Sequence, residues 1–355
     1  MDQPEDWTEP GAFEVVTGVH RIPLPLPTDG LRAVNVYAVD DGDRLVLIDA
    51  GWAVQEAQRQ LEKALGAVGR SLADISRFLV THMHRDHYTL AVTVRRLFGT
   101  RVSLGVGERA AIEWAGDPDR HGLSPQVDQL RRCGATDLAG RIAELASAAE
   151  RHPEDWEPPD DWLDGGQSLA LAGRELVAIR TPGHTNGHVV FADERDDLLF
   201  AGDHVLPHIT PSIGFEPVPG ELPLRSYLDS LALVRRLPDR LLLPAHGPVA
   251  SSVHARVDQL LDHHGERLDA CRRAVEQGRS TGYEVATALP WTRRARPFAD
   301  LSTFNQMLAV GETESHLQLL VAQGRLGRSV VAGVVHYAPG APPGGPPDVP
   351  LGRSR

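Results

Sequence analysis

The sequence predicts an α/β fold followed by a small appended domain. Short β-rich runs alternate with helical segments from residue 13 to residue 250, as expected for sheets that are covered by helices. The chain has 355 residues, of which 41% are hydrophobic, so it can bury a sizeable core and is slightly long for one ordinary domain. We therefore expect one large domain and one smaller unit.

The large domain is expected at residues 13–250, after a flexible, acidic and proline-punctuated N-terminus at residues 1–12. Its strands are predicted from short runs of apolar and β-branched residues. These runs are Ala33–Val39, Arg44–Ile48, Arg77–Val80, Arg101–Leu104, Leu176–Ile179, His188–Phe191, Leu198–Phe200 and Leu241–Leu243. Helical spacing of apolar residues appears at Val54–Leu65, Leu90–Leu97 and Arg225–Leu237.

The pattern changes between about residues 105 and 166. Loops and helical turns replace the alternation there, and Trp114, Trp156 and Trp162 stand among clustered prolines and aspartates. An insertion of this length usually covers or shapes a site.

The C-terminal third is expected to form a connecting helix and a small unit. Helical spacing over Val253–Ala274 predicts the connecting helix, at 251–279. Residues 280–337 are predicted as a winged-helix-like domain, and the Pro/Gly-rich stretch 338–355 as a disordered tail. Within the domain we expect helices at Tyr283–Leu289, Phe304–Val310 and Thr313–Gln323, then a hairpin at Leu326–Tyr337.

Composition excludes several classes of function. The net charge of −12 argues against a general attraction to nucleic-acid backbones or anionic membranes, and no apolar run is long enough to span a membrane. Lys63 is the single lysine, which nearly excludes Schiff-base chemistry. Cys133 and Cys271 stand outside any C-x-x-C pattern and the N-terminus has no signal-peptide pattern, so we expect reduced thiols in a cytoplasmic protein.

The strongest chemical signal is the run from Thr81 to His87, T-H-M-H-R-D-H, directly after an apolar run. In extended backbone, residues two apart point the same way, so His82 and His84 can converge on one metal ion while the following turn directs Asp86 and His87 elsewhere. Four candidate ligands thus lie within six residues.

Three more ligand-type residues occur just past predicted strand ends. They are His184 in T-P-G-H-T, Asp203 in A-G-D-H and His246 in P-A-H-G. Loops at the ends of adjacent strands are where an α/β scaffold builds its site, and the glycine or proline beside each ligand permits tight turns.

These motifs, in this order, resemble those of the metallo-β-lactamase superfamily. The resemblance covers roughly residues 13–250 and implies an αββα four-layer sandwich, here with the small C-terminal winged-helix-like domain. Carried over, His82, His84 and His184 would bind a first metal ion and Asp86, His87 and His246 a second, with Asp203 bridging the two. The ligand set has nitrogen and oxygen but no sulfur, which fits two Zn²⁺ ions and also permits iron or manganese.

The resemblance also implies a hydrolytic mechanism. A metal-bridging hydroxide would attack the substrate, with Asp86 and Asp203 as the catalytic carboxylates. Asp49, in the D-x-G element after a strand, would buttress the site without binding metal. Near these motifs, we interpret His188 mainly as a structural residue and Tyr88 mainly as a packing residue. His204 and His208 could each belong to the substrate pocket or to the scaffold, and they are the candidates for protonating the leaving group.

Three activities remain open from the sequence. The glyoxalase II-like arrangement of the metal motifs favours hydrolysis of a small acyl ester, thioester or lactone. The stretch His316–Leu326 resembles the endoribonuclease-like branch related to mammalian β-lactamase-like protein 2, so cleavage of RNA or another phosphodiester is the second possible activity. The third is that of a mononuclear iron persulfide dioxygenase. The net charge over 281–337 is about +1, which is too little for a surface that follows a phosphate backbone. We therefore expect the C-terminal unit to form a wall of the pocket or a homodimer interface, in preference to binding nucleic acid.

Overall fold

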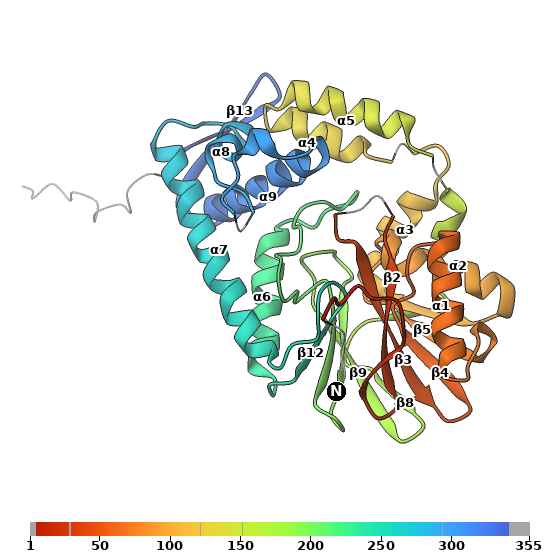
Figure 1. Cartoon of the computed structure of the whole chain (residues 1–355). Helices are drawn as coiled ribbons and strands as arrows, with labels where there is room; N and C mark the ends of the chain where they lie inside the picture. Colours follow the sequence, from red (N-terminus) through yellow and green to blue (C-terminus); the bar gives the residue numbers. More distant parts are fainter. Residues whose placement is uncertain (1–4, 28–29, 121, 151, 293, 341–355) are drawn as a thin grey trace, which may run out of the picture.

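Two β-sheets lie face to face and helices cover both outer faces in the computed structural model, which describes residues 5–27, 30–120, 122–150, 152–292 and 294–340 (Figure 1). The expected αββα four-layer sandwich is thereby confirmed. A helical cluster with a β-hairpin lies beside the sandwich, and the long helix α7 (Val253–Glu276) connects the two parts.

The first sheet has seven strands in sequence order. Its strands are β1 (Phe13–Val16), β2 (Val19–Pro25), β3 (Ala33–Asp41), β4 (Arg44–Ile48), β5 (Ile75–Leu79), β6 (Arg101–Gly105) and β7 (Asp161–Leu163). The pairs from β1 to β4 are antiparallel, and those from β4 to β7 are parallel. Parallel neighbours require crossovers, and here α1 (Gln55–Ala67) and α2 (Arg85–Phe98) provide the first two.

The second sheet has five strands in the order β12-β11-β10-β9-β8. Its strands are β8 (Ser168–Leu171), β9 (Arg174–Arg180), β10 (Val189–Asp193), β11 (Leu198–Gly202) and β12 (Leu241–Pro244). Only the β11–β12 pair is parallel, and α6 (Pro223–Arg236) makes its crossover. Both strands of that pair end at the same edge of the sheet, which places Asp203 and His246 side by side.

Alternation along the strands divides the core into layers. In β10, Val189 and Phe191 face the space between the sheets, whereas Val190 and Ala192 face outward to α6 and α7. Successive side chains of a strand point to opposite faces, so a fully apolar strand is the expected sequence for a sheet that is covered on both sides.

The insertion contains more helix than the sequence predicted. It folds into α3 (Arg109–Gly116), α4 (Ser124–Arg132) and α5 (Thr136–Ala148), besides two short 3-10 turns. Apolar side chains of α4 and α5 belong to the same core cluster as those of the C-terminal helices. The helices α4 and α5 therefore pack together with the C-terminal unit, whereas α3 packs against the first sheet's core cluster.

The C-terminal unit contains α8 (Gly282–Ala288), α9 (Thr303–Ala322) and a hairpin of β13 (Leu326–Val331) and β14 (Val334–Pro339). The hairpin is confirmed, but the expectation of two helices between 304 and 323 was wrong. The residues between the two expected helices lie inside one continuous helix, and Gly311 is buried there against Gly214, on which a Cβ would lie 3.2 Å from the Gly311 carbonyl oxygen. The winged-helix likeness itself stays a prediction.

Several strands had no clear sequence signal. The strands β1, β2, β7 and β8 were not predicted, since β2 carries two prolines and the others are only three or four residues long. The hairpin also continues to Pro339, slightly past the expected start of the tail at 338. The rest of that tail from 341, like residues 1–4 of the expected flexible N-terminus, lies outside the described residues.

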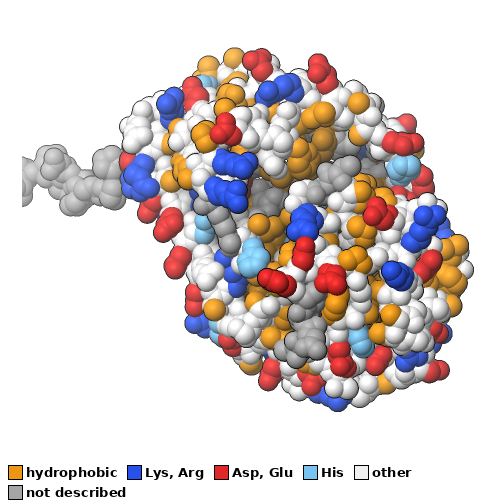
Figure 2. All heavy atoms as spheres, in the orientation of Figure 1, with side chains coloured by type: hydrophobic (Ala, Val, Ile, Leu, Met, Phe, Trp, Pro, Cys, Tyr) orange, Lys and Arg blue, Asp and Glu red, His pale blue; other side chains and the backbone are white. Residues whose placement is uncertain are grey.

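One face of the molecule is hollowed where the helical body meets the sandwich, and hydrophobic side chains gather around the hollow (Figure 2). Both cysteines are buried and unpaired. Within the described ranges, every helix is too short or too polar to cross a bilayer.

Candidate metal centre

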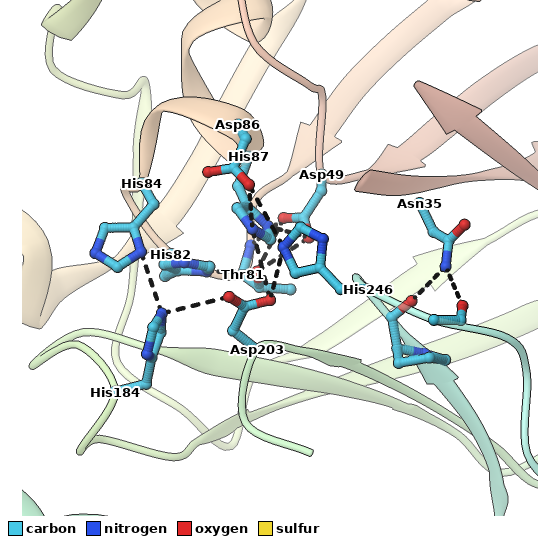
Figure 3. Close-up of polar contacts among 12 residues, drawn as sticks. Asn35, Asp49, Thr81, His82, His84, Asp86, His87, His184, Asp203 and His246 are labelled. Carbon is cyan, nitrogen blue, oxygen red and sulfur yellow. Dashed lines mark hydrogen bonds and ion pairs between the residues drawn. The ribbon is translucent and has the colours of Figure 1, made fainter. Parts of the chain in front are cut away.

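The seven predicted ligands come together at one edge of the two sheets (Figure 3). His82 and His84 lie on the segment between β5 and α2, while Asp86 and His87 occupy the first turn of α2. His184 follows β9, and the remaining ligands follow the adjacent strands β11 and β12. The fold thus converts separate strand ends into one cluster.

One group of potential ligand atoms consists of three imidazoles, from His82, His84 and His184. Their ligand nitrogens lie within 4.8 Å of one another. Nε2 of His184 is 3.1 Å from Nδ1 of His84 and 3.5 Å from Oδ2 of Asp203. This arrangement can hold one cation with nitrogen donors and a carboxylate at its side.

A second group consists of Asp86, His87 and His246, again within 4.8 Å. Nε2 of His246 lies 3.4 Å from both Oδ2 of Asp86 and Oδ1 of Asp203. Nε2 of His87 is 3.6 Å from the same two oxygens. Asp203 therefore directs one carboxylate oxygen toward each group, as a bridging ligand would.

Hydrogen bonds at the outer ring nitrogens fix three of the histidines. Nδ1 of His184 donates to the Ser212 carbonyl at 2.7 Å, and Nδ1 of His246 donates to the Ala33 carbonyl at 2.8 Å. Nδ1 of His87 lies 2.9 Å from Oδ2 of Asp49. In a neutral ring whose Nδ1 carries the proton, Nε2 presents its lone pair to the cluster, which is the tautomer that a metal requires.

Asp49 is held in an uncommon backbone conformation, with φ of 60°. Its carboxylate accepts hydrogen bonds from the Thr81 backbone N–H at 2.8 Å and from the Thr81 hydroxyl at 3.0 Å, besides its contact with His87. Non-glycine residues in the left-handed region cost free energy and persist where the surroundings require them. Asp49 contacts the candidate ligand His87 and belongs to none of the ligand groups.

Four inward-facing atoms fit bound cations. Nε2 of His82, His87 and His246 and Oδ1 of Asp203 are buried, yet none finds a hydrogen-bond partner among the described residues. A buried polar atom without a partner costs about 1–3 kcal/mol, so four at one place are not expected unless something else satisfies them. Imidazole nitrogens and carboxylate oxygens are the donor types that zinc, iron and manganese accept.

The pKa values of the ligands differ between the two groups. Burial lowers the pKa of His84 to about 3 and that of His184 to about 4, so both are neutral donors at pH 7. Burial also opposes a charge on His87, but the carboxylates of Asp49, Asp86 and Asp203 outweigh it and raise its pKa to about 10. The second group therefore has an excess of negative charge that favours a cation.

The other predicted site residues divide into three kinds. His188 is buried; its Nε2 accepts from the Asp203 backbone N–H at 3.2 Å and its Nδ1 lies 2.8 Å from the Thr181 hydroxyl, so it holds the bridging segment. Tyr88 is buried and its hydroxyl donates a hydrogen bond to the Glu157 carbonyl, so it is a packing residue.

The two candidate proton donors differ in exposure. His204 is buried against Tyr227, whereas His208 is exposed and lies beside Gly247, next to His246.

Two supporting residues were not singled out from the sequence. The Asn35 amide donates to the carbonyls of Pro244 and Gly247, at 3.0 and 2.8 Å, and thereby holds the loop of His246. Glu108 is fully buried and accepts a hydrogen bond from the Thr185 hydroxyl. A polar residue inside an apolar strand is the one signal that would have identified Asn35.

Comparisons with known proteins identify the superfamily of this chain. The family model for the metallo-β-lactamase superfamily matches residues 29–246, which contain all seven candidate ligands. A metallo-β-lactamase family protein from Thermus thermophilus has a similar structure, with a TM-score of 0.77 and 27% identity over 92% of this chain and 100% of that one. A β-lactamase domain protein from Burkholderia ambifaria gives a TM-score of 0.74 and 26% identity, over 95% and 98%.

Curated relatives include proteins named as hydrolases. The chain is 26% identical over 317 residues to the probable metallo-hydrolase YqjP of Bacillus subtilis, which is 85% of this chain and 91% of that protein. It is 23% identical over 252 residues to an atrochrysone carboxyl ACP thioesterase of Aspergillus fumigatus, 71% of this chain and 46% of the thioesterase. The match therefore covers about half of that fungal enzyme.

Proposed function

The chain belongs to the metallo-β-lactamase superfamily and is a hydrolase of that superfamily, and we propose that it uses two divalent metal ions to cleave a small acyl ester, thioester or lactone. The observation that carries the proposal is the set of buried nitrogen and oxygen atoms that lack hydrogen-bond partners among the described residues, contributed by His82, His87, His246 and Asp203. The ligand set has no sulfur, and zinc is the proposed native metal.

In this proposal, the two ions supply Lewis acidity and generate a nucleophile at neutral pH. The protein residues fix where the substrate reacts. Asp203 holds the two ligand groups at a set separation, and Asp86, which is partly exposed to solvent, orients the attacking water. No side-chain nucleophile is required.

The leaving group requires a proton, and the exposure of the candidates favours one of them. His204 is fully buried against Tyr227, whereas His208 is exposed beside Gly247, near the second ligand group. We therefore assign leaving-group protonation to His208. A turnover number unchanged in a His208→Ala variant would exclude this role.

Burial of α9 argues against the ribonuclease alternative. In a winged-helix protein the helix before the hairpin enters the nucleic-acid groove. Here α9 occupies that position, and twelve of its twenty residues are buried, including Leu317 and Leu320. A helix so enclosed cannot present its side chains to bases without unpacking the C-terminal unit.

The test combines elemental analysis with an activity panel of S-lactoylglutathione, p-nitrophenyl esters, a lactone and a single-stranded RNA. We expect about two zinc ions per chain and turnover of at least one acyl substrate. RNA cleavage without acyl turnover would refute the proposal, and so would one iron per chain with oxygen consumption. An Asp203→Asn variant controls for a contaminating esterase, since its acyl turnover should fall to background.

A further inference from the structure

Aromatic rings lead outward from the candidate metal centre. The ring of His84 lies 5.9 Å from that of Phe215, and Phe215 lies 5.7 Å from Phe304, with both pairs packed edge to face. Phe215 belongs to the segment between β11 and α6, whereas Phe304 lies in the first turn of α9. A continuous aromatic surface thus joins a ligand residue to the C-terminal unit.

Phe215 is held in place from two sides. Its carbonyl accepts a hydrogen bond from the Gln126 side chain of α4, at 2.5 Å. The preceding Gly214 lies so close to α9 that a Cβ on it would be 2.6 Å from the Ser315 hydroxyl. A small crevice between Phe215, Ile213 and Met307 continues the apolar surface along α9. Because the backbone is fixed, Phe215 is a preformed wall rather than an adaptable one.

Phe304 is exposed to an extent that packing does not explain. It is 43% exposed, and Ile209, on the same connecting segment as Phe215, is 41% exposed. Large apolar side chains at these exposures are few among the described residues. Ile209 lies on the segment that follows Asp203, and Phe304 approaches the candidate ligands through its contact with Phe215. Exposed apolar surface beside a site commonly marks where a ligand binds.

We propose that Phe215 and Phe304 bind the apolar acyl part of the substrate, and that Phe304, from the C-terminal unit, determines the acyl-chain preference. This inference rests on the proposed acyl hydrolysis. The two rings adjoin the His82, His84 and His184 group, whereas His208 lies beside the loop of His246. The acyl group is therefore placed on the side of the first ligand group, and the leaving group on the side of the second.

The experiment compares kcat/KM for p-nitrophenyl esters from acetate to decanoate in the wild type and in a Phe304→Ala variant. In the wild type we expect kcat/KM to rise with chain length, because each methylene that contacts a hydrophobic pocket contributes about tenfold or more. In the variant the ratio of kcat/KM for decanoate to kcat/KM for acetate should fall by about tenfold or more, mostly through a higher KM for decanoate. A Phe304→Leu variant should retain most of the preference.

The matched control is Phe98→Ala. Phe98 is 49% exposed but stands at the far end of α2, whose first turn carries Asp86 and His87. Its removal should leave the chain-length profile unchanged. In a series of esters with one acyl group and varied leaving groups, kcat/KM should depend on the leaving group equally in Phe304→Ala and in the wild type. If the variant changes only this dependence, the leaving group binds at Phe304 and the inference is wrong.

A binding measurement separates this inference from the proposed function. Unreactive thioether analogues with methyl and octyl chains can be titrated calorimetrically into the metal-loaded protein. If the octyl analogue binds more tightly than the methyl one and Phe304→Ala removes the difference, the inference holds even when no ester is turned over. If esters are hydrolysed but both proteins show the same chain-length profile, the inference is wrong and the proposed function stands.

Discussion

Oδ2 of Asp49 lies 2.9 Å from Nδ1 of His87, which directs Nε2 of that histidine toward Asp86 and Asp203. The contact determines both the tautomer and the orientation of one candidate ligand. A residue outside the candidate ligand groups can thereby influence how well its neighbour binds a metal.

Asp49→Ala should weaken binding of the second metal ion by about 10- to 100-fold, as expected for the loss of an outer hydrogen-bond partner. The first ion should bind nearly as before, since Asp49 reaches its histidines only indirectly, through the Thr81 hydroxyl that lies beside His82. Competition with a chromogenic chelator measures both affinities. Asp43→Asn, an exposed change at the other end of β4, is the control. Equal affinities in the variant and the wild type would mean that Asp49 only supports the fold.

Asp203→Asn should reduce the metal content from about two ions to about one and abolish acyl turnover, because both ligand groups share this carboxylate. Inductively coupled plasma mass spectrometry measures the stoichiometry. The control is Asp197→Asn, which changes an exposed aspartate just before β11, whereas Asp203 follows that strand. Full activity with two bound ions in Asp203→Asn would refute the assigned site.

Glu108→Ala should weaken the first metal ion by about 10- to 100-fold. The buried carboxyl accepts from the Thr185 hydroxyl and also from backbone groups at Met83 and Gly187, so it connects the segments that carry His82, His84 and His184. Burial raises the pKa of Glu108 to about 7, and a neutral amide should therefore substitute well. We expect near-normal affinity in Glu108→Gln. The exposed Glu113→Ala is the control, and loss of affinity there as well would point to a nonspecific effect.

Acid should destabilise the C-terminal unit through a buried histidine pair. Nδ1 of His264 is 3.1 Å from Nε2 of His316, and burial lowers the pKa of His316 to about 4. Since the unfolded state binds a proton near pH 6.5 and the folded state does not, this stability is complete above pH 6.5 and is lost as the pH falls toward 4.

His316→Asn should reduce the slope of unfolding free energy against pH in that window by up to about 1.4 kcal/mol per pH unit. The side-chain amide of the asparagine can still donate a hydrogen bond to the Glu312 carbonyl, as Nδ1 of His316 does in the wild type. Urea unfolding in excess chelator at several pH values gives the slopes, and His152→Asn, at a histidine more than half exposed, should leave the slope unchanged. Parallel slopes for His316→Asn and the wild type would exclude the pair as the acid-sensitive element.

Much of the sandwich was predictable because its strands are buried on both faces. An apolar run such as Leu198–Phe200 is identifiable wherever it lies, and β4 was predicted with its observed bounds. Short edge strands depend on neighbours for their pairing, so β1 and β7 left no pattern. The prediction divided α9 into two helices although it is continuous from Thr303 to Ala322, because its burial comes from tertiary packing that a local pattern does not show.

The ligands were predictable for a different reason. Their residue types are rare in apolar surroundings, and each of their motifs follows a strand. Supporting residues such as Asn35 and Glu108 act through hydrogen bonds to segments that are remote in sequence, Asn35 to a loop 209 to 212 positions away, and spacing along the chain carries no trace of that. The exposed position of Phe304 beside Phe215 likewise follows only from the folded chain.

The packing of the insertion against the C-terminal unit determines when the protein can mature during synthesis. Arg141 of α5 bonds to Gln306 of α9, 165 positions later, and Cys133 lies against Glu314, 181 positions later. Until the ribosome has released α9, the apolar side chains of α4 and α5 that α9 covers in the folded protein lack that cover. The nascent chain therefore carries an aggregation-prone surface through the translation of almost half its length, and its last step is a long-range docking that is expected to be slow.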